Sequence, residues 1–404
     1  MLSLRGDRML TNQNRFLSLM LIAAVRGFSQ PRILTATTRP SRTIMTAAQL
    51  TQDIAACGER LRQGHLVAFP TETVYGLGCH ALDVDAVAKV FAAKERPLTD
   101  PLIVHVLEFT DAMALWQVPT DLERQILTRL CRDFWPGPLT LVAAANRSVV
   151  PDTIMAHTGY CACRSPAHPT ARTLLQASQR PLAAPSANKF GHVSPTTATH
   201  VWDDLQHEDV WILQDDDTPC DVGVESTVAK LAMAEDSRGV LTVLRQGAVS
   251  VEDLKAAVGD LPVEVVAQLS RATADTVANV APGQTIRHYS PNIPSFLVSS
   301  ECMQGVCDDD LLKKAVVIDY GQQLAHWRET ACAYRDLTPT GESATAAQNV
   351  FETLRWAEQV EEADYIVFPK PLSEDALALA VKDRLTRAAS GVVIDSLAEV
   401  AVKR

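Results

Sequence analysis

Short apolar runs alternate with amphipathic segments along most of the chain. Thr46 can cap a first helix that ends at Gly64, with Leu50, Ile54, Cys57 and Leu61 on one face. Strands are predicted at 65–69, 102–106, 139–145, 161–164, 182–184, 210–213, 226–231 and 240–244. Further helices are predicted at 84–93, 122–134, 169–178 and 251–258. Because strands and helices mix without strict alternation, the pattern predicts one α/β domain over residues 46–265.

One stretch, residues 69–100, combines a strand end, a small polar turn and a helix. The turn reads Pro-Thr-Glu-Thr-Val-Tyr-Gly-Leu-Gly over residues 70–78. The helix that follows has Val84, Val87 and Phe91 on its predicted inner face, and it ends in Lys94-Glu95-Arg96-Pro97. A polar loop beside two cations favours a site for a small molecule that carries phosphates.

After residue 265 the pattern is interrupted and then restarts. Residues 266–294 are predicted to be a linker, rich in proline near its end and carrying Arg287-His288-Tyr289. Strands at 295–298, 315–319 and 365–368 then alternate with helices at 344–361 and 375–388. This alternation predicts a small Rossmann-like domain over residues 295–404. It lacks a G-x-G-x-x-G turn, so dinucleotide binding is not expected.

Charge is distributed unevenly along the chain. The formal net charge is -11, yet residues 1–45 carry seven arginines and only one aspartate. The remainder is therefore strongly acidic, which disfavours general nucleic-acid binding, because such binding requires a positive surface. At most a weak tRNA contact is expected, and any anion site must be a local group of cations.

The first 45 residues are rich in Arg, Ser and Thr. This composition fits either an organellar transit peptide or a disordered extension before a second start at Met45. The expected location is cytoplasmic, and possible mitochondrial targeting through the arginine-rich N-terminus stays open. The apolar patch at 17–25 is too short to span a bilayer, and no membrane association is expected.

The cysteines and the acidic runs do not indicate a metal site or disulfide bonds. Nine cysteines without a C-x-x-C pair predict neither a zinc framework nor a disulfide scaffold, and Cys161 and Cys163 are expected to pack in a core. The aspartate runs at 215–217 and 308–310 are expected to be solvated loops. No metal site formed directly by side chains is predicted.

Several polar residues stand at predicted element ends. Lys94 and Arg96 can simply complement a helix C-terminus, or they can clamp a phosphate. Ser186 and Asn188 follow a short strand, where turn formation is the default interpretation. Because the chain contains no Ser-His-Asp order, no H-E-x-x-H and no Walker A pattern, nucleotidyl transfer with magnesium held partly by substrate phosphates fits best.

Four motifs in order give the chain a family resemblance. Phe-Pro-Thr-Glu-Thr-Val-Tyr-Gly-Leu-Gly, Lys94-x-Arg96-Pro97 and Pro185-Ser186-Ala187-Asn188 resemble the YrdC-like threonylcarbamoyl-AMP synthases. His288-Tyr289-Ser290-Pro291 and the domain after it resemble the long form of that family. The resemblance implies a YrdC-like twisted mixed sheet with helices, followed by the small Rossmann-like domain.

The resemblance also implies a reaction and partners. L-Threonine, bicarbonate and ATP, with Mg²⁺, would give threonylcarbamoyl-AMP and pyrophosphate. The product would pass to a tRNA threonylcarbamoyl transferase complex, which modifies the adenosine beside the anticodon of tRNAs.

Site residues are carried over from the family pattern position by position. The implied catalytic signature is Lys94, Arg96, Ser186 and Asn188. Threonine recognition would involve Thr73, His105, Arg164, Ser186 and Ser226. ATP contacts would involve Arg96, Asp100, Tyr160, Asn188, Thr196, Arg245 and His288, with Tyr289 in a lid. Asp100 stands where many members have asparagine, so its contact with ATP could be direct or through magnesium.

Two other functional classes are weighed against the synthase. An RNA-binding module without catalysis is disfavoured by the acidic body of the chain. A carbamoyl-transfer domain related to hydrogenase maturation factors would need acylphosphatase and zinc-binding modules, and the sequence displays neither.

Overall fold

The structure is a computed structural model, and it describes residues 47–215, 218–268, 279–280, 289–305 and 308–403. The predicted N-terminal extension therefore lies outside the described residues, as does most of the predicted linker. Within the described part, no helix is both long and apolar enough to cross a membrane.

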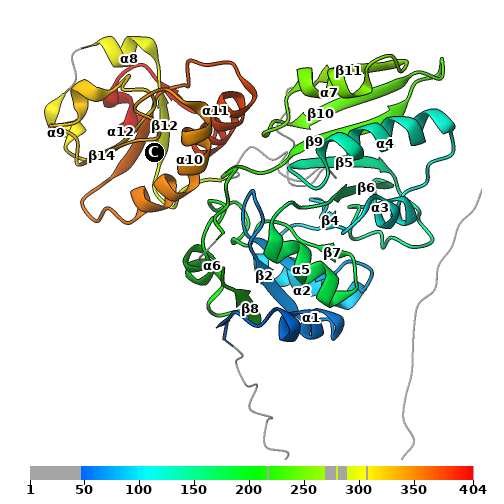
Figure 1. The fold of residues 1–404 in the computed structure, drawn as a ribbon. Helices are drawn as coiled ribbons and strands as arrows, with labels where there is room; N and C mark the ends of the chain where they lie inside the picture. Colours follow the sequence, from blue (N-terminus) through cyan, green and yellow to red (C-terminus); the bar gives the residue numbers. More distant parts are fainter. Residues whose placement is uncertain (1–46, 216–217, 269–278, 281–288, 306–307, 404) are drawn as a thin grey trace, which may run out of the picture. The chain divides into compact units, whose positions relative to one another are not determined.

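The first sheet contains eleven described strands, and it is mixed (Figure 1). Its order is β1-β8-β2-β3-β7-β4-β6-β5-β9-β10-β11. The bounds are β1 Gln49–Thr51, β2 Leu66–Phe69, β3 Gly76–His80, β4 Ile103–His105, β5 Leu139–Ala144, β6 Tyr160–Arg164, β7 Leu182–Ala183, β8 Val210–Leu213, β9 Thr227–Met233, β10 Gly239–Arg245 and β11 Val263–Ala267. The sheet contains parallel pairs, such as β4 with β6, and antiparallel pairs, such as β5 with β6. The predicted mixed α/β sheet is confirmed.

Seven described helices accompany this sheet. They are α1 Ile54–Arg62, α2 Val84–Lys94, α3 Phe109–Leu115, α4 Asp121–Phe134, α5 Pro169–Ser178, α6 Ala198–Leu205 and α7 Val251–Val258. Helices α1 and α5 pack side by side, and α4 packs against α7. Polar caps set their ends: the Asp83 carboxylate accepts from the backbone N–H groups of Asp85 and Ala86 at the start of α2. The same helix ends at Lys94, and the next residue, Glu95, has a left-handed φ of 56° that turns the chain toward Arg96.

Three local predictions were wrong. Leu50 does not lie in a helix but in β1, where residues 49–51 pair with β8. Val84 is 54% exposed rather than inward, because it occupies the first turn of α2. Residues 76–80 form β3 rather than a turn, and Gly78 makes this possible: a Cβ there would lie 2.7 Å from the Phe69 ring. For Leu50 and for residues 76–80, pairing with a distant strand decided the structure, and the local pattern does not contain that information.

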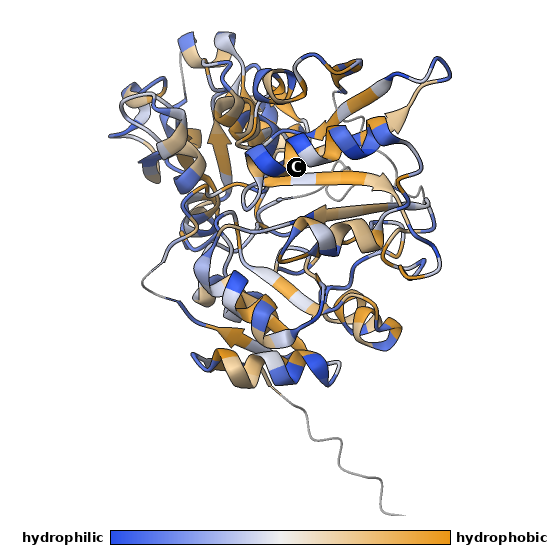
Figure 2. Cartoon of the chain, turned by 45° about the vertical axis from the view of Figure 1, so that its right-hand side comes forward, coloured by the Kyte–Doolittle hydropathy of each residue, from blue (hydrophilic) through white to orange (hydrophobic). Residues whose placement is uncertain are grey.

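The second sheet has five described strands, all parallel, in the order β14-β13-β15-β12-β16. Their bounds are β12 Ser295–Val298, β13 Ala315–Asp319, β14 Ala333–Asp336, β15 Tyr365–Phe368 and β16 Val393–Ile394. The main helices of this region are α10 Ser343–Glu358 and α11 Ala376–Ala388, and the shorter ones are α8 Ser300–Gln304, α9 Asp309–Leu312 and α12 Val400–Lys403. Figure 2 shows the strands largely in the hydrophobic colour, while the helices display both colours. A second sheet that is parallel and accompanied by helices, as the sequence predicts for this region, is confirmed.

Loops of the first domain contribute to the apolar core of the second. Val74, Val193 and Val224 belong to the same buried cluster as Tyr289 and Phe351. At Gly223 the backbone has φ of +72°, and a Cβ would lie 2.4 Å from the Ala347 carbonyl oxygen of α10. The loop can therefore contact α10 so closely only because residue 223 has no side chain.

We predict that Gly223→Ala lowers the thermal midpoint of unfolding by much more than Gly341→Ala. Both glycines have a left-handed φ, so each substitution costs roughly 1–2 kcal/mol of backbone strain. Only Gly223 adds a collision, since nothing lies within 4 Å of a Cβ at Gly341. Calorimetry on the two variants checks this, and equal shifts would contradict the close contact with α10.

Candidate functional site

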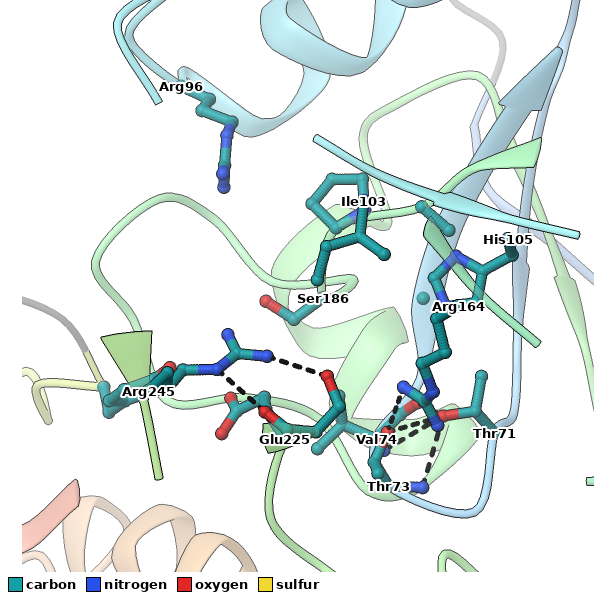
Figure 3. Close-up of a pocket in the computed structure, with 15 residues that line it drawn as sticks. Thr71, Thr73, Val74, Arg96, Ile103, His105, Arg164, Ser186, Glu225 and Arg245 are labelled. Carbon is teal, nitrogen blue, oxygen red and sulfur yellow. Dashed lines mark hydrogen bonds between the residues drawn. The ribbon is translucent and has the colours of Figure 1, made fainter. Parts of the chain in front are cut away.

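A cavity opens where several strand ends and turns of the first sheet meet (Figure 3). Its polar walls come from the turn after β2, the loop after α2, the ends of β4, β6 and β10, and the turn before β9. The lining residues are Thr71, Thr73, Val74, Gly76, Arg96, Ile103, His105, Arg164, Ala184, Pro185, Ser186, Glu225, Ser226, Arg245 and Tyr289. The structure thus brings together eight predicted site residues from segments far apart in the chain: Thr73, Arg96, His105, Arg164, Ser186, Ser226, Arg245 and Tyr289.

Arg164, at the end of β6, is fixed by an ion pair and a hydroxyl. Its Nη2 lies 2.7 Å from Oε1 of Glu72, and its Nη1 donates to Oγ1 of Thr73 at 2.9 Å. Burial alone would raise the pKa of Glu72, but the charge and hydrogen bonding of Arg164 lower it below its ordinary value. Glu72 is therefore a carboxylate, and Arg164 is held in place before any ligand arrives.

The two threonines of the turn form an ordered hydroxyl chain. Oγ1 of Thr71 donates to the Val74 carbonyl at 2.6 Å, and the two threonine hydroxyls lie 2.9 Å apart. Because the Thr71 proton is committed to Val74, the Thr73 hydroxyl donates to Thr71. Thr73 then presents acceptor capacity to the cavity.

Arg245, at the end of β10, lies beside Ser226. Its Nε donates to the Ser226 carbonyl at 3.1 Å, and its Nη2 donates to Ser226 Oγ at 3.1 Å. Oγ of Ser226 also lies 2.7 Å from Oγ1 of Thr140. Of the three arginines that line the cavity, Arg245 is the one with no ion pair to a described carboxylate. It supplies positive charge that the described part of the chain does not neutralise by direct pairing.

Arg96 reaches the cavity from the loop after α2. Its Nη2 lies 2.9 Å from Oδ2 of Asp100, a carboxylate that is itself fully buried. Its Nε and Nη2 also donate to the backbone carbonyls of Asp100 and Pro101. Asp100 does not line the cavity, so the structure places it as the partner of Arg96 behind the wall.

Lys94 and Asn188 also lie behind the wall rather than in it. Nζ of Lys94 donates to the carbonyl oxygens of Ser186, at 2.7 Å, and of Asn188. Burial, followed by the charge of Arg96, lowers the pKa of Lys94 well below its ordinary value. The Asn188 amide donates to the carbonyls of Lys189 and His192. Both side chains therefore shape the loop that presents Ser186.

His105 is a neutral group in the wall. Burial and the nearby charge of Arg164 lower its pKa to about 3. Its ring stands edge-on to Phe69, with the two centroids 6.2 Å apart. At neutral pH it can therefore position a substrate but carries no charge.

The remaining predicted residues are placed differently. Tyr289 is fully buried: it packs against Phe351 at 5.5 Å between ring centroids, and it also borders the cavity. Tyr160 lies under Lys230, and Thr196 contacts His200, both away from the cavity lining. His288 lies outside the described residues. The site assignments taken from the family pattern remain predictions.

Three acidic or hydroxylic residues were missed. Thr71 and Glu72 belong to the polar turn that the sequence singles out, but the turn alone does not tell which side chains face inward. Glu225 lines the cavity directly before Ser226. Its only local signal is that it is the one carboxylate in the small polar turn at 223–227.

Two family models together match most of the chain. A Sua5/YciO/YrdC model, described as "Telomere recombination", matches residues 59–247. A model described as "Threonylcarbamoyl-AMP synthase, C-terminal domain" matches residues 249–390. The chain belongs to the YrdC-like threonylcarbamoyl-AMP synthase family, in its long form.

Individual members of this family are similar over nearly their full length. A threonylcarbamoyl-AMP synthase of Pyrococcus abyssi is 34% identical over 340 residues, which are 83% of this chain and 93% of that protein. One from Bacillus subtilis is 32% identical, with 84% and 94% covered. The crystal structure of P. abyssi Sua5 complexed with L-threonine aligns with a TM-score of 0.70 and 32% identity, covering 86% of this chain and 98% of that one. The chain is thus an enzyme of the nucleotidyltransferase type.

We predict that Glu72→Gln lowers the free energy of unfolding by about 3–5 kcal/mol at neutral pH, because Arg164 then stays buried without its carboxylate. The native pKa of Glu72 is depressed, so its stabilising effect is present above the unfolded pKa of about 4.3 and is lost as pH falls. The difference between wild type and variant should therefore shrink below about pH 4.

Urea denaturation at a series of pH values measures this difference. Glu352→Gln is the matched control, because Glu352 pairs with Arg335 at 3.0 Å on the exposed surface. Such a pair contributes about 0–1 kcal/mol. A pH-independent difference for Glu72→Gln would contradict the buried ion pair.

Proposed function

We propose that this enzyme is an L-threonylcarbamoyladenylate synthase, which converts L-threonine, bicarbonate and ATP into threonylcarbamoyl-AMP and pyrophosphate. The observation that carries the proposal is the convergence of Arg96, Arg164 and Arg245 with several hydroxyls on one cavity. Such a set suits substrates that bring both a carboxylate and phosphates. The names of the relatives and the threonine complex of P. abyssi Sua5 support the same substrates.

The threonine site of the proposal lies around Arg164. Its guanidinium offers a fork to the threonine carboxylate, while Thr73 offers an acceptor to the ammonium or hydroxyl group. Ser186 and Ser226 add hydroxyls to the same cavity. His105 is uncharged there, so it serves to position the amino acid.

The ATP site of the proposal lies around Arg245 and Arg96. Arg245, which has no ion pair among the described residues, and Arg96, which pairs with Asp100, would neutralise the triphosphate as it reacts. Three carboxylates lie at or behind the cavity wall: Glu72 and Asp100 pair with Arg164 and Arg96, and Glu225 pairs with Arg384. Because they are committed to arginines, we assign Mg²⁺ to the phosphates of its substrate, MgATP, and not to a protein carboxylate.

The reaction follows from this arrangement. Threonine, in its free-amine form after loss of the ammonium proton, and bicarbonate first give a carbamate with loss of water. An oxygen of that carbamate then attacks the α-phosphorus, and the bond to the leaving pyrophosphate breaks. Since the attacking group is already an anion, the cavity contributes orientation and charge neutralisation rather than a general base. Tyr289, which lies within the predicted linker, borders the cavity, and this position supports a lid that excludes water from a labile product.

The product would serve the threonylcarbamoylation of the adenosine beside the anticodon of tRNAs. In this proposal a separate tRNA threonylcarbamoyl transferase complex receives the adenylate.

The direct test is incubation of the full chain with ATP, threonine and bicarbonate. Mass spectrometry should detect threonylcarbamoyl-AMP, and pyrophosphate should appear in equal amount. Omission of either threonine or bicarbonate is the control and should abolish both products. Pyrophosphate release that is independent of threonine would contradict the proposed reaction.

We predict opposite effects for the two members of the Arg96–Asp100 pair. Arg96→Met should lower kcat/KM for ATP by about 10²-fold, because a donor to the reacting phosphates is lost. Asp100→Asn should instead lower the KM for ATP, by roughly threefold. Two backbone carbonyls still hold Arg96, and its charge is no longer neutralised.

Steady-state kinetics on the purified variants measures both effects. Asp260→Asn is the control for net charge, because Asp260 pairs with Arg129 on the surface and its side chain is 86% exposed. Its kinetic constants should match those of the wild type. A raised KM for ATP in Asp100→Asn would contradict the assignment of Asp100 as a neutralising partner.

A further inference from the structure

One fully buried cation reaches the catalytic domain from the C-terminal domain. Arg384 lies in α11, and its side chain is 0% exposed. Its Nε donates to Oε2 of Glu225 at 3.1 Å, and its Nη1 donates to the Gln246 carbonyl at 2.8 Å. It thus binds two loops of the catalytic domain, one before β9 and one after β10.

Glu225 transmits this contact to the cavity. It lines the cavity, and its second oxygen, Oε1, accepts from Ser194 Oγ at 2.5 Å. The next residue, Ser226, accepts from Arg245 through both its carbonyl and its hydroxyl. A chain of contacts therefore runs from Arg384 through Glu225 and Ser226 to Arg245, and Figure 3 labels Glu225 and Arg245 in the cavity wall.

The surroundings of this turn leave it little room to move. A Cβ at Gly247 would lie 2.3 Å from the Thr227 nitrogen and 2.7 Å from the Glu225 carbonyl oxygen. On the other side, Gly223 lies against α10, and Gln348 donates to the Asp221 carbonyl at 2.7 Å. The turn at 221–227 is thus held from both domains.

The chemistry of the Arg384–Glu225 contact indicates that it does more than hold the two domains together. Burying an ion pair costs desolvation free energy. An apolar contact of the same size often stabilises the folded state as well or better. A guanidinium fork, by contrast, fixes the orientation of the carboxylate and carbonyls that it binds. Here the oriented group is adjacent to the proposed substrate contacts.

We propose that Arg384 is a positioning residue of the catalytic site, which fixes Glu225 and thereby places Ser226 and Arg245 for threonine and ATP. The catalytic site is then complete only when the C-terminal domain contributes α11. This inference rests on the proposed function for the roles of Ser226 and Arg245.

The test compares two arginines that both bridge the domains. Arg355 of α10 is buried and pairs with Asp204 at 3.1 Å, but Asp204 does not line the cavity. Arg384→Met should lower kcat/KM for threonine and for ATP on the order of 10²-fold, as expected for misplaced substrate contacts. Arg355→Met should lower the thermal midpoint similarly, but leave the KM for threonine within about twofold. Arg384→Lys, which keeps the charge without the fork, should fall between Arg384→Met and wild type.

A double variant keeps the test informative where Arg384→Met fails to fold. Arg384→Met with Glu225→Gln removes both charges of this buried ion pair together, so the double variant should fold, while its kcat/KM stays low. Equal kinetic losses in Arg384→Met and Arg355→Met, or near-normal kinetics in the double variant, would overturn the proposal.

Calorimetry separates this proposal from the proposed function. If the wild-type chain formed no adenylate, the proposed function would fail. Even then, the affinities of the wild type and of Arg384→Met for threonine and for ATP would show whether Arg384 positions the binding residues. Weaker binding of both ligands by the variant supports the positioning role, and unchanged binding overturns it.

Discussion

The cavity of the first domain depends on arginine side chains that are buried before any anion binds. Burying a guanidinium is costly unless a partner compensates its charge and hydrogen-bonding groups. Arg164 and Arg96 are compensated by Glu72 and Asp100, and Arg96 also donates to backbone carbonyls. Arg245 instead donates to Ser226. The cavity is thus ordered before an anion binds, and it retains attraction for anions because Arg245 has no ion pair with a carboxylate in the described part of the chain.

The same constraint links the two domains. Glu225 lies in the cavity wall, and burying a carboxylate without a cation beside it would be unfavourable. Arg384 supplies that cation from 159 residues away in the sequence. Val224 and Gly223 then bring apolar packing and close backbone contact to the same turn. The interface between the two domains therefore also forms part of the cavity wall.

The sequence predicted the fold well where local signals decide it. Helices α5 and α7 lie at the predicted residues, because Pro169 opens one and Ser250 caps the other. Leu50 and the 76–80 segment were mispredicted because their strand partners, β8 and β2, cannot be read from a local window. Likewise the motifs identified Arg96 and Ser186, but no local pattern indicates Glu225 with Arg384, whose pairing arises from the tertiary fold.

The Lys-x-Arg and Ser-x-Asn signature has two structural parts. Glu95 has a left-handed backbone conformation, and Lys94 and Arg96 on either side of it therefore point in different directions. Arg96 turns to the cavity, while Lys94 turns to the carbonyls of Ser186 and Asn188. Asn188 in turn donates to the carbonyls of Lys189 and His192 within its own loop. One residue of each pair faces the cavity, and the other fixes the loop that presents Ser186. The two motifs are spaced apart in sequence yet act as one unit, since the lysine of the first motif binds the backbone of the second.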